Sequence, residues 1–580
     1  MNKTVLKARI SNYYKSACDY QKRRHAEWLE NYTLSRNRVQ LNRLTQRQNI
    51  VVPLTKETQK SIIANIDDAP DIAFEDLSAN QEKEIFINEQ WNDDFRRNNL
   101  EIKDIVDKKQ VFCYGRSFKK LNFENGKFIA EIVDVYDLKV DRHTDPSDIE
   151  TANYLCHDNI FRTLTDIETN KNYDFDVVEE IKAELSTKAG KSYIAETAES
   201  MQAKEKRISA MGDENAFDPI VGETYLGICE HYIKLSNENY NPEAVDGTME
   251  SFPALIHVVV KIKEKVLMNK TMWELFGVNF FPFESWADDV ENTDFWSDAC
   301  ADIVRPANKV LNAWLAQLTE NRTLRNFGMS YYNNTNNKYD PNTFEPEPFG
   351  HYGVPGNPNE LIKRVDVPEL KESLTEIQWL MDMAGRATAA TAAVKGETES
   401  RTVTLGEVKL VYQNAMERIT SMQKFYRLSW QRFAEKWWQM MQASANQIIP
   451  VKLYKKGISG KYYSKDVSPE DWKSEAGFKV IVTSSTEQEQ VSMETIERLH
   501  AIVEAMSDNP VVQRIYKKKL LEIGRLSSEE QKEALDFEKQ KQLAVNSPQS
   551  ELAQSMQLAT QPVLPSPSSF AGQGNQITNN

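Results

Sequence analysis

Four side chains that could bind a metal ion lie close together in the sequence. Asp141, His143, Asp145 and Asp148 provide carboxylate and imidazole groups within eight residues. A calcium-binding loop needs a central glycine and a terminal glutamate, and this segment has neither. A strand pattern precedes the segment, so we interpret it as a polar turn that follows a strand.

Sequence motifs for catalysis are missing as well. Gly190-Lys191-Ser192 has the end of a phosphate-binding loop, but Leu185 stands where the first glycine of that motif belongs, and helical patterns flank the segment. The seven histidines form no HExxH motif, and there is no GxSxG motif. The sequence therefore offers no candidate catalytic residues, no metal site and no cofactor motif, although missing motifs alone do not exclude an enzyme. The five cysteines form no CxxC pair; they are Cys18, Cys113, Cys156, Cys229 and Cys300.

The stretch AGRATAATAAVKGETESRT, from Ala384 to Thr402, combines small side chains with three basic residues, Arg386, Lys395 and Arg401. Strong helical patterns lie on both sides of it. On composition alone it is a linker, or a helix C-terminus that ends at Gly396.

The composition limits the class of protein. The chain has 580 residues, of which 40% are hydrophobic and 27% charged, and its formal net charge is −15. That length supports several domains. The negative charge argues against a simple DNA coat, but it leaves room for a local basic patch or for a passage in which DNA slides. We see no signal peptide and no apolar run that could span a membrane, so we expect a soluble protein made in the cytoplasm.

The N-terminal region departs from this acidic balance. Residues 1–60 hold 13 Lys and Arg against 4 Asp and Glu. We interpret the region as an amphipathic helix with a solvated basic face, and a contact with nucleic acid or an acidic partner is the alternative. The interleaved apolar positions are Tyr13, Tyr14, Tyr20, Trp28, Tyr32 and Leu34.

Hydrophobic periodicity predicts the helices. We expect them over Leu54–Ile66, Ile85–Lys108, Thr163–Arg207, Asp294–Arg325, Pro368–Ala384 and Leu405–Ala445. In the fourth, Pro306 should kink the helix or begin its second part, and one face should carry Phe295, Ile303, Val310, Trp314 and Leu318. The last would be about 40 residues and about 60 Å long. Its apolar face should comprise Val408, Tyr412, Ala415, Ile419, Met422, Tyr426, Phe433, Trp437 and Met440.

Strand patterns occupy the segments between these helices. Val111–Pro146 should form three or four strands with a hairpin turn at Glu124-Asn125-Gly126. Phe283–Asp294 looks like a loop, and Gly328–Pro368 like an irregular β module because of its many Pro, Asn and Gly residues. Other short strands are expected just before Pro53 and over Glu223–Leu235, Ala254–Val266, Ile448–Tyr454 and Phe478–Thr483.

The order of these segments resembles the portal proteins of tailed bacteriophages. Four stretches carry the resemblance: Arg43–Glu75, with a strand leading into a helix that ends near a Pro; Val111–Ile167, with an aromatic-Gly turn and the strand Val-Asp-Val-Tyr-Asp; the helix, module and helix of Asp294–Ala384; and Thr388–Trp430. A long Asn- and Glu-rich loop at Asn237–Gly247 departs from the pattern. Together the matching stretches cover most of residues 40–445.

The resemblance implies an α+β, mainly helical fold with wing, stem, clip and crown regions, assembled into a ring around a central channel. The regions would be 1–293, an N-terminal wing with a basic helical arm and a β-rich part; 294–325, a first stem helix; 326–367, the clip; 368–385, a second stem helix; 386–404, a tunnel loop; 405–490, the long wing helix and returning strands; 491–545, crown helices; and 546–580, a disordered tail.

The same resemblance implies a function, and it implies that the protein is not an enzyme. The protein would form a homo-oligomeric ring, usually of twelve subunits, at one vertex of the capsid in the virion, after assembly in the host cytoplasm. Double-stranded DNA would pass through its channel during packaging and ejection. Its partners would be the terminase large subunit, the major capsid protein, the scaffolding protein and the head-tail adaptor or tail proteins, with no membrane contact.

The resemblance also implies site residues. In the tunnel loop, Arg386, Lys395, Thr398 and Arg401 would face DNA. In the clip, the residues that contact partners would be Tyr331, Tyr332, Phe344, Phe349 and Tyr352.

Two other classes of protein remain open on the sequence. One is another structural phage protein, such as a head-tail adaptor or an injected internal protein. The other is a nucleic-acid-processing enzyme such as a packaging ATPase, which would need a phosphate-binding loop after a strand.

Overall fold

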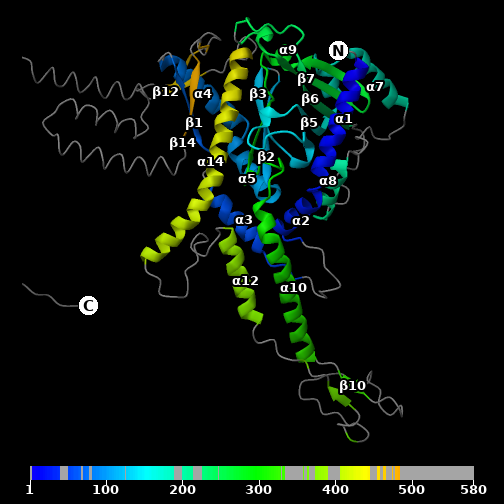
Figure 1. Ribbon diagram of the computed structural model, residues 1–580, viewed down its shortest axis with the longest axis vertical. Helices are drawn as coiled ribbons and strands as arrows, with labels where there is room; N and C mark the ends of the chain where they lie inside the picture. Colours follow the sequence, from blue (N-terminus) through cyan, green and yellow to red (C-terminus); the bar gives the residue numbers. More distant parts are fainter. Residues whose placement is uncertain are drawn as a thin grey trace, which may run out of the picture. The chain divides into compact units, whose positions relative to one another are not determined.

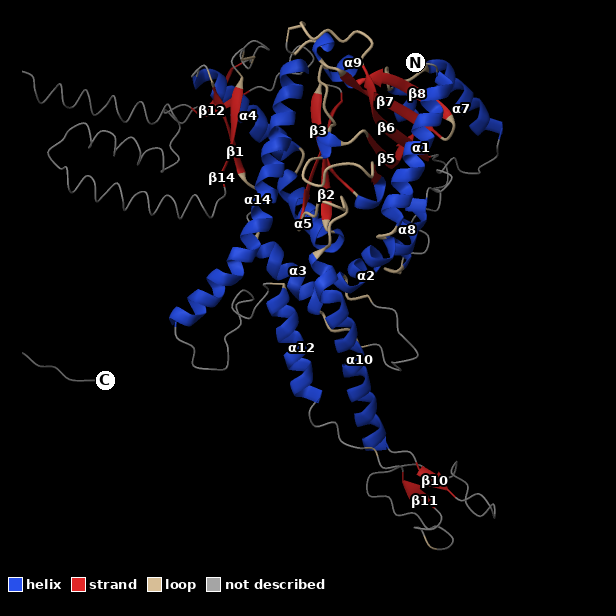
Figure 2. Ribbon diagram, in the orientation of Figure 1, coloured by secondary structure: helices blue, strands red, loops and turns tan. Residues whose placement is uncertain are grey.

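The computed structural model describes residues 3–38, 50–66, 69–77, 81–124, 126–187, 199–212, 225–245, 247–327, 330–332, 357, 362–364, 367, 373–388, 405–444, 453–456, 462–465, 473–474 and 477–483. The chain divides into one unit of Met1–Leu453 with Ser464–Ser485 and a second of Tyr454–Tyr463 with Thr486–Asn580. The expected helices and tail after residue 491 lie outside the described residues. In the described residues, helices alternate with small sheets, and every pair of strands with an assigned register is antiparallel (Figures 1 and 2).

The basic N-terminal region is helical, as expected. It forms α1 (Lys3–Lys22) and α2 (His25–Ser35). The inward positions recur at helical spacing and are buried, whereas most of the basic side chains are exposed, which confirms an amphipathic arrangement. Trp28 anchors α2 in an aromatic cluster, with its ring centroid 5.3 Å from those of Tyr136 and Trp296.

The next two predicted helices have different outcomes. α3 (Leu54–Asn65) confirms the first of them. The helix expected over Ile85–Lys108 is instead two helices, α4 (Gln81–Arg97) and α5 (Leu100–Tyr114). Asn99 has a φ of 51°, a left-handed conformation that an α-helix cannot include. α5 then continues to Tyr114, so the strand pattern expected from Val111 begins only at Arg116.

A three-stranded sheet follows α5. β2 (Arg116–Glu124) and β3 (Lys127–Val133) form the predicted hairpin, with Glu124 paired to Lys127. The prediction of a loop over Phe283–Asp294 is wrong for the first part of that segment. There, β9 (Phe283–Ala287) pairs with the other edge of β2.

The larger sheet has five strands in chain order: β4 (Leu138–Val140), β5 (Tyr154–Thr163), β6 (Tyr225–Ser236), β7 (Ala254–Ile262) and β8 (Lys265–Thr271). The strands expected from Glu223 and Ala254 are confirmed. The second ends at Ile262, because Lys263, with a φ of 52°, turns the chain into β8. The helical region from Thr163 is in three described parts: α6 (Leu164–Thr169), α7 (Phe175–Thr187) and α8 (Glu199–Ser209). Short helices lie at Val135–Asp137, Ile149–Thr151, Met249–Ser251 and α9 (Met272–Phe276).

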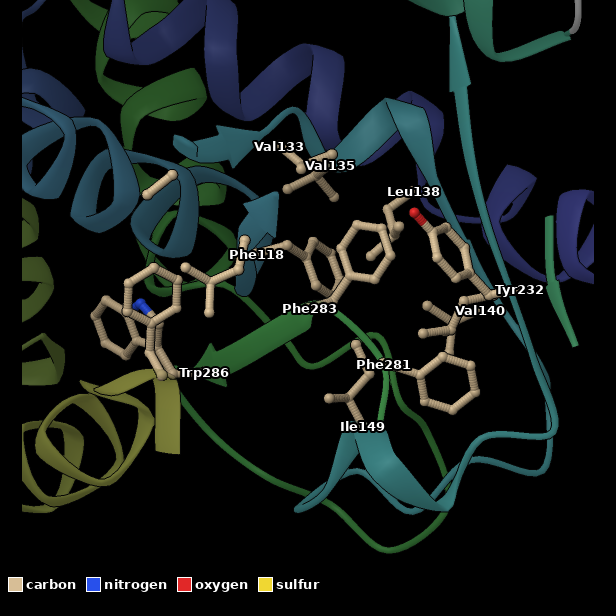
Figure 3. Packing of buried hydrophobic residues seen from close by; sticks show 14 of the residues in the cluster. Phe118, Val133, Val135, Leu138, Val140, Ile149, Tyr232, Phe281, Phe283 and Trp286 are labelled. Carbon is tan, nitrogen blue, oxygen red and sulfur yellow. The ribbon is translucent and has the colours of Figure 1, made fainter. Parts of the chain in front are cut away.

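The core of this unit contains side chains from both sheets. Figure 3 shows side chains from β2, β4, β6 and β9 in one cluster. Phe118, Leu138 and Phe283 are fully buried there. Burial of this apolar surface, worth about 25 cal/mol per Å², joins the two sheets.

A small sheet joins segments far apart in the sequence. β1 (Asp71–Asp76) pairs antiparallel with β14 (Phe478–Thr483), so that Asp71 lies opposite Thr483. The strand at Phe478 was predicted, and its partner was not. Two further strands, β12 (Leu453–Lys456) and β13 (Tyr462–Lys465), pair with each other; of the strand expected over Ile448–Tyr454, only its end is described, and it lies in β12.

The remaining helices follow the predicted order. α10 (Cys300–Phe327) begins later than expected, because Asp294–Ala299 forms a hydrogen-bonded loop, and it continues through Pro306. β10 (Ser330–Tyr332) and β11 (Ile362–Arg364) pair with each other and are followed by α12 (Ser373–Ala387). α14 (Leu405–Ser444) has the predicted length of 40 residues. Figure 1 shows α10 and α12 side by side.

Gly115 should be intolerant of any side chain. It ends α5 with a φ of 79°, and a Cβ atom there would lie 2.1 Å from the carbonyl oxygen of Ser297. We expect Gly115→Ala to lower the free energy of unfolding by at least about 3 kcal/mol, because backbone would have to move. Gly247→Ala is the control: its φ is 82° and nothing lies within 4 Å, so it should cost only about 1–2 kcal/mol. Urea denaturation compares the two, and equal losses would contradict the assignment of a close backbone contact.

Candidate functional site

The helices on either side of the predicted clip pack against each other. The packed cluster comprises Val304, Ala307 and Leu311 of α10, Ile377, Leu380 and Ala384 of α12, and Leu54 of α3, all buried. On each long helix these positions recur at three- and four-residue steps, as a packed stripe requires. The predicted face of α10 is right in part: Trp314 and Leu318 pack against this cluster, whereas Ile303 and Val310 are 52% and 39% exposed. Phe295 is buried but precedes the helix.

Two buried asparagines fix α10 to the N-terminal region. The Asn308 side-chain oxygen accepts hydrogen bonds from the Thr55 backbone N–H at 3.0 Å and its hydroxyl at 2.7 Å. The Asn312 side-chain oxygen accepts one from the Val52 N–H at 2.8 Å, and the Asn308 amide donates to the Val52 carbonyl at 3.1 Å. The prediction of a strand just before Pro53 is therefore wrong. Asparagine side chains, and not a neighbouring strand, make the hydrogen bonds to this backbone.

Charged groups add a second attachment between α2 and α10. The Asp302 carboxylate accepts hydrogen bonds from Arg305 at 2.7 Å and from the amide of Asn31 at 3.0 Å. Arg24 donates to the carbonyl of Trp296 at 2.8 Å and pairs with Asp294 at 3.3 Å. These contacts hold the first turns of α10 in one orientation.

The start of α10 also faces a carboxyl group with an unusual pKa. Asp288 follows β9, and its backbone N–H donates to the Gly115 carbonyl at 3.1 Å. Partial burial, together with the neighbouring charge of Asp289, raises the pKa of Asp288 to about 7, and the Cys300 backbone N–H opposes the shift. A carboxyl group that titrates near neutral pH thus lies where β9, α5 and α10 meet.

The described C-terminal part of α14 packs into the unit through both apolar and charged groups. Ile419, Met422, Tyr426, Phe433, Trp437 and Met440 are buried, as predicted, and the side chains of Val408, Tyr412 and Ala415 lie outside the described set.

Two buried ion pairs lie beside this face, Lys108–Asp104 at 2.6 Å and Lys119–Asp107 at 2.7 Å. α14 contributes to both: the Tyr426 hydroxyl donates to Asp104 at 2.7 Å, and Lys119 donates to the Ser429 hydroxyl at 2.9 Å. Burial raises the pKa of Asp104, although Lys108 favours its ionised form. This network defines the rotation and register of α14.

Of the predicted tunnel-loop residues, the structure places Arg386. It lies exposed in the last turn of α12, where its Nε donates to the Asp382 carbonyl at 3.4 Å and a positive charge suits the helix dipole. The helix closes at Thr388, whose hydroxyl donates to the Ala384 carbonyl at 3.0 Å. Lys395, Thr398 and Arg401 lie outside the described residues.

The predicted clip is described in part. The backbone of Tyr331 and Tyr332 forms β10, paired with Lys363 and Ile362 of β11. Phe344, Phe349 and Tyr352 lie outside the described residues, as does the Gly190-Lys191-Ser192 segment.

The candidate metal ligands lie in a hydrogen-bonded turn. Asp145 accepts from the backbone N–H and hydroxyl of Ser147, at 2.8 and 2.7 Å, and Asp148 accepts from the Glu150 N–H at 3.0 Å. These bonds agree with a polar turn after β4. Across the described part of the chain, no group of His, Cys, Asp and Glu side chains has the arrangement of a metal site.

Sequence reasoning missed Asn308, Asn312 and Asp288. The two asparagines are four residues apart on the apolar side of a predicted helix. Buried side-chain amides need hydrogen-bond partners, so this spacing indicates that the helix binds the backbone of a neighbouring segment. Asp288 has no such signal, because its pKa depends on how the chain folds around it.

Comparison of the chain with known protein families gives no match to any family model, and comparison with curated proteins gives none either. Among the residues that the structure describes, no helix is both long and apolar enough to cross a membrane.

Asp288 should make stability depend on pH. Its pKa in the folded protein, about 7, is above the ordinary value of 3.8. Between these values the folded state binds more protons than the unfolded state, so stability should fall as the pH rises from 4 to 7. Asp288→Asn should remove this dependence and be more stable than wild type at pH 8 by about 2–4 kcal/mol.

Urea denaturation at pH 4.5 and pH 8 measures the effect of Asp288→Asn. Glu291→Gln is the matched control, because Glu291 is an exposed carboxylate nearby in the sequence and is not among the groups that shift the pKa of Asp288. It should change stability little. An Asp288→Asn effect that is the same at both pH values would contradict the raised pKa.

Proposed function

We propose that this chain is the subunit of a bacteriophage portal ring, a non-enzymatic conduit for double-stranded DNA at one vertex of the capsid. The order of elements supports the proposal: helix α10, the strand pair β10–β11, helix α12, the small-residue stretch and the 40-residue helix α14. The packed pair of α10 and α12 fits two stem helices, and the strand pair between them fits a clip.

The outer surfaces of α10 and α12 support assembly. Besides the stripe that faces α12, α10 exposes Ile303 and Val310, and α12 exposes Trp379 and Met383 outside the packed cluster. A helix that is apolar on two sides is normally covered on both. In a closed ring, each subunit presents two different surfaces to its neighbours, and these exposed residues suit that arrangement.

The basic residues suit a passage for DNA. Arg386 marks the point where α12 ends and the segment with Lys395, Thr398 and Arg401 begins. A few positive charges in a chain of net charge −15 allow brief phosphate contacts without strong retention, because affinity for DNA rises steeply with each contact.

The partners follow from this role. The clip, with Tyr331 and Tyr332 on β10, would meet the terminase large subunit during packaging and the adaptor or tail proteins afterward. The major capsid protein and the scaffolding protein would surround the ring during assembly. The mature protein would reside in the virion, where the ring also serves DNA ejection.

Imaging of the purified protein tests the proposal directly. Negative-stain micrographs with mass measurement should give rings of about a dozen subunits with a central hole. The double variant Val310→Asp with Met383→Asp should form no rings, because each change puts a charge on an apolar contact. Val245→Asp is the control, since Val245 is 77% exposed in a loop, and it should assemble normally. A monomer with DNA-dependent ATP hydrolysis would disprove the proposal.

Reversal of charge in the tunnel loop should separate assembly from transport. Lys395→Glu with Arg401→Glu should leave rings intact and reduce DNA packaging or retention, because phosphate would meet negative charge. The measurements are ring counts and packaged DNA per particle, with Lys395→Arg and Arg401→Lys as the charge-preserving control. Loss of rings in the glutamate variant would mean that these residues have a structural role.

A further inference from the structure

One face of α1 carries a concentration of positive charge that the portal role leaves unexplained. Its exposed basic side chains are Lys7, Arg9, Lys15, Lys22 and Arg23, and the helix contains a single acidic residue, Asp19. Arg142, in the turn after β4, is exposed beside them. We call these six basic residues the α1 basic face.

The centre of this face is a cleft. Three basic side chains and one carboxylate line it, and its volume is about 350 Å³. The lining residues are Asn12, Lys15, Ser16, Asp19, Tyr20, Arg23 and Arg142. Two guanidinium groups lie near the Tyr20 ring, with Arg23 at 4.6 Å and Arg142 at 5.9 Å from its centroid. The aromatic ring thus holds two cations near one opening.

Several of these charges have no counter-ion in the fold. Arg23 pairs with Asp294 at 3.2 Å. Lys7, Lys15 and Arg142 make no ion pair within the described part of the chain. These three cations are therefore available to a ligand that carries negative charge.

The residue types favour phosphate over a protein partner. Lys and Arg on this face alternate with exposed Ser11, Asn12 and Ser16, and these are the side chains that commonly contact the DNA backbone. A protein interface would be expected to offer aromatic or large apolar anchors. On α1 the exposed large apolar side chain is Val5, at the start of the helix.

The spacing along α1 fits duplex DNA. Lys7, Lys15 and Lys22 are separated by eight and seven residues, or about 12 and 10.5 Å at 1.5 Å per residue. The major groove is about 12 Å wide, so successive lysines can contact phosphates on its two sides. At physiological ionic strength the Debye length is about 8 Å, so negative charges elsewhere on the protein are largely screened from a phosphate bound here.

We propose that the α1 basic face is a second DNA-binding surface, one that holds the sugar-phosphate backbone of duplex DNA from outside any channel and without sequence preference. It is independent of the tunnel loop and of ring formation. The cleft between Arg23 and Arg142 would bind one phosphate group of the DNA backbone. The lysines of α1 would bind the adjacent phosphate groups.

Circular DNA tests the proposal, because a closed circle cannot thread a ring. The full-length protein should bind a relaxed circular duplex in a filter-binding or mobility assay, with affinity that falls steeply from 50 to 200 mM salt. The triple variant Lys7→Gln, Lys15→Gln and Arg142→Gln should bind at least about tenfold more weakly at 100 mM salt, and the slope of log affinity against log salt should decrease by about 3.

Two control variants isolate this surface. Lys109→Gln with Lys127→Gln and Lys171→Gln removes three exposed charges elsewhere and should bind as wild type. Lys395→Glu with Arg401→Glu, in the tunnel loop, should also leave binding of circular DNA unchanged.

Three results would overturn the proposal. They are no binding of circular DNA by the wild type, equal loss of affinity in the control variants, and tighter binding of poly-glutamate than of duplex DNA at equal charge concentration, which would assign the surface to an acidic protein. Ring imaging of the same samples is independent of these outcomes, so failure of the portal role is distinguishable from failure of the second surface.

Discussion

The arrangement of the molecule depends on two ion pairs that are removed from water. The side chains of Asp104, Lys108, Asp107 and Lys119 are at most 3% exposed. Burial of a charge costs several kcal/mol unless a partner and further hydrogen bonds satisfy it, and loss of one partner typically costs 3–5 kcal/mol. The Trp286 N–H, at 2.7 Å from Asp107, supplies one such bond, and α14 supplies the others. Displacement of α14 would therefore remove the Tyr426 and Ser429 hydrogen bonds from the two buried pairs, although each carboxylate would keep its lysine partner.

Fixing α14 in turn orders the elements around it. Lys436 of α14 pairs with Glu284 of β9 at 3.0 Å and with Glu150 at 2.6 Å, and the Trp437 N–H reaches Asp94 of α4 at 3.1 Å. β9 leads through Asp288 to the first turn of α10. Helices α14 and α10 are thus tied to one charged core.

The sequence allowed prediction of elements whose signal is local. α3, α14 and the β2–β3 hairpin have strong periodicity or turn chemistry, and they occur as expected. The division between α4 and α5 was missed because the helical pattern continues across Asn98-Asn99. β9 was missed because Glu284 looks solvent-exposed until Lys436, from far along the chain, neutralises it. On α10 two apolar stripes have the same period, and periodicity alone cannot tell which one packs inward. Of the predicted tunnel-loop residues, only Arg386 is among the described residues, at the end of α12.

The pairing of β1 with β14 has a consequence for the order of events in the cell. Phe74 lies opposite Val480, so this sheet cannot close until the ribosome has released more than four-fifths of the chain. Contacts of such high sequence separation form slowly and leave strand edges open meanwhile. Nascent chains would therefore keep this sheet unformed until late in translation, and β1 would lack its partner strand for most of synthesis.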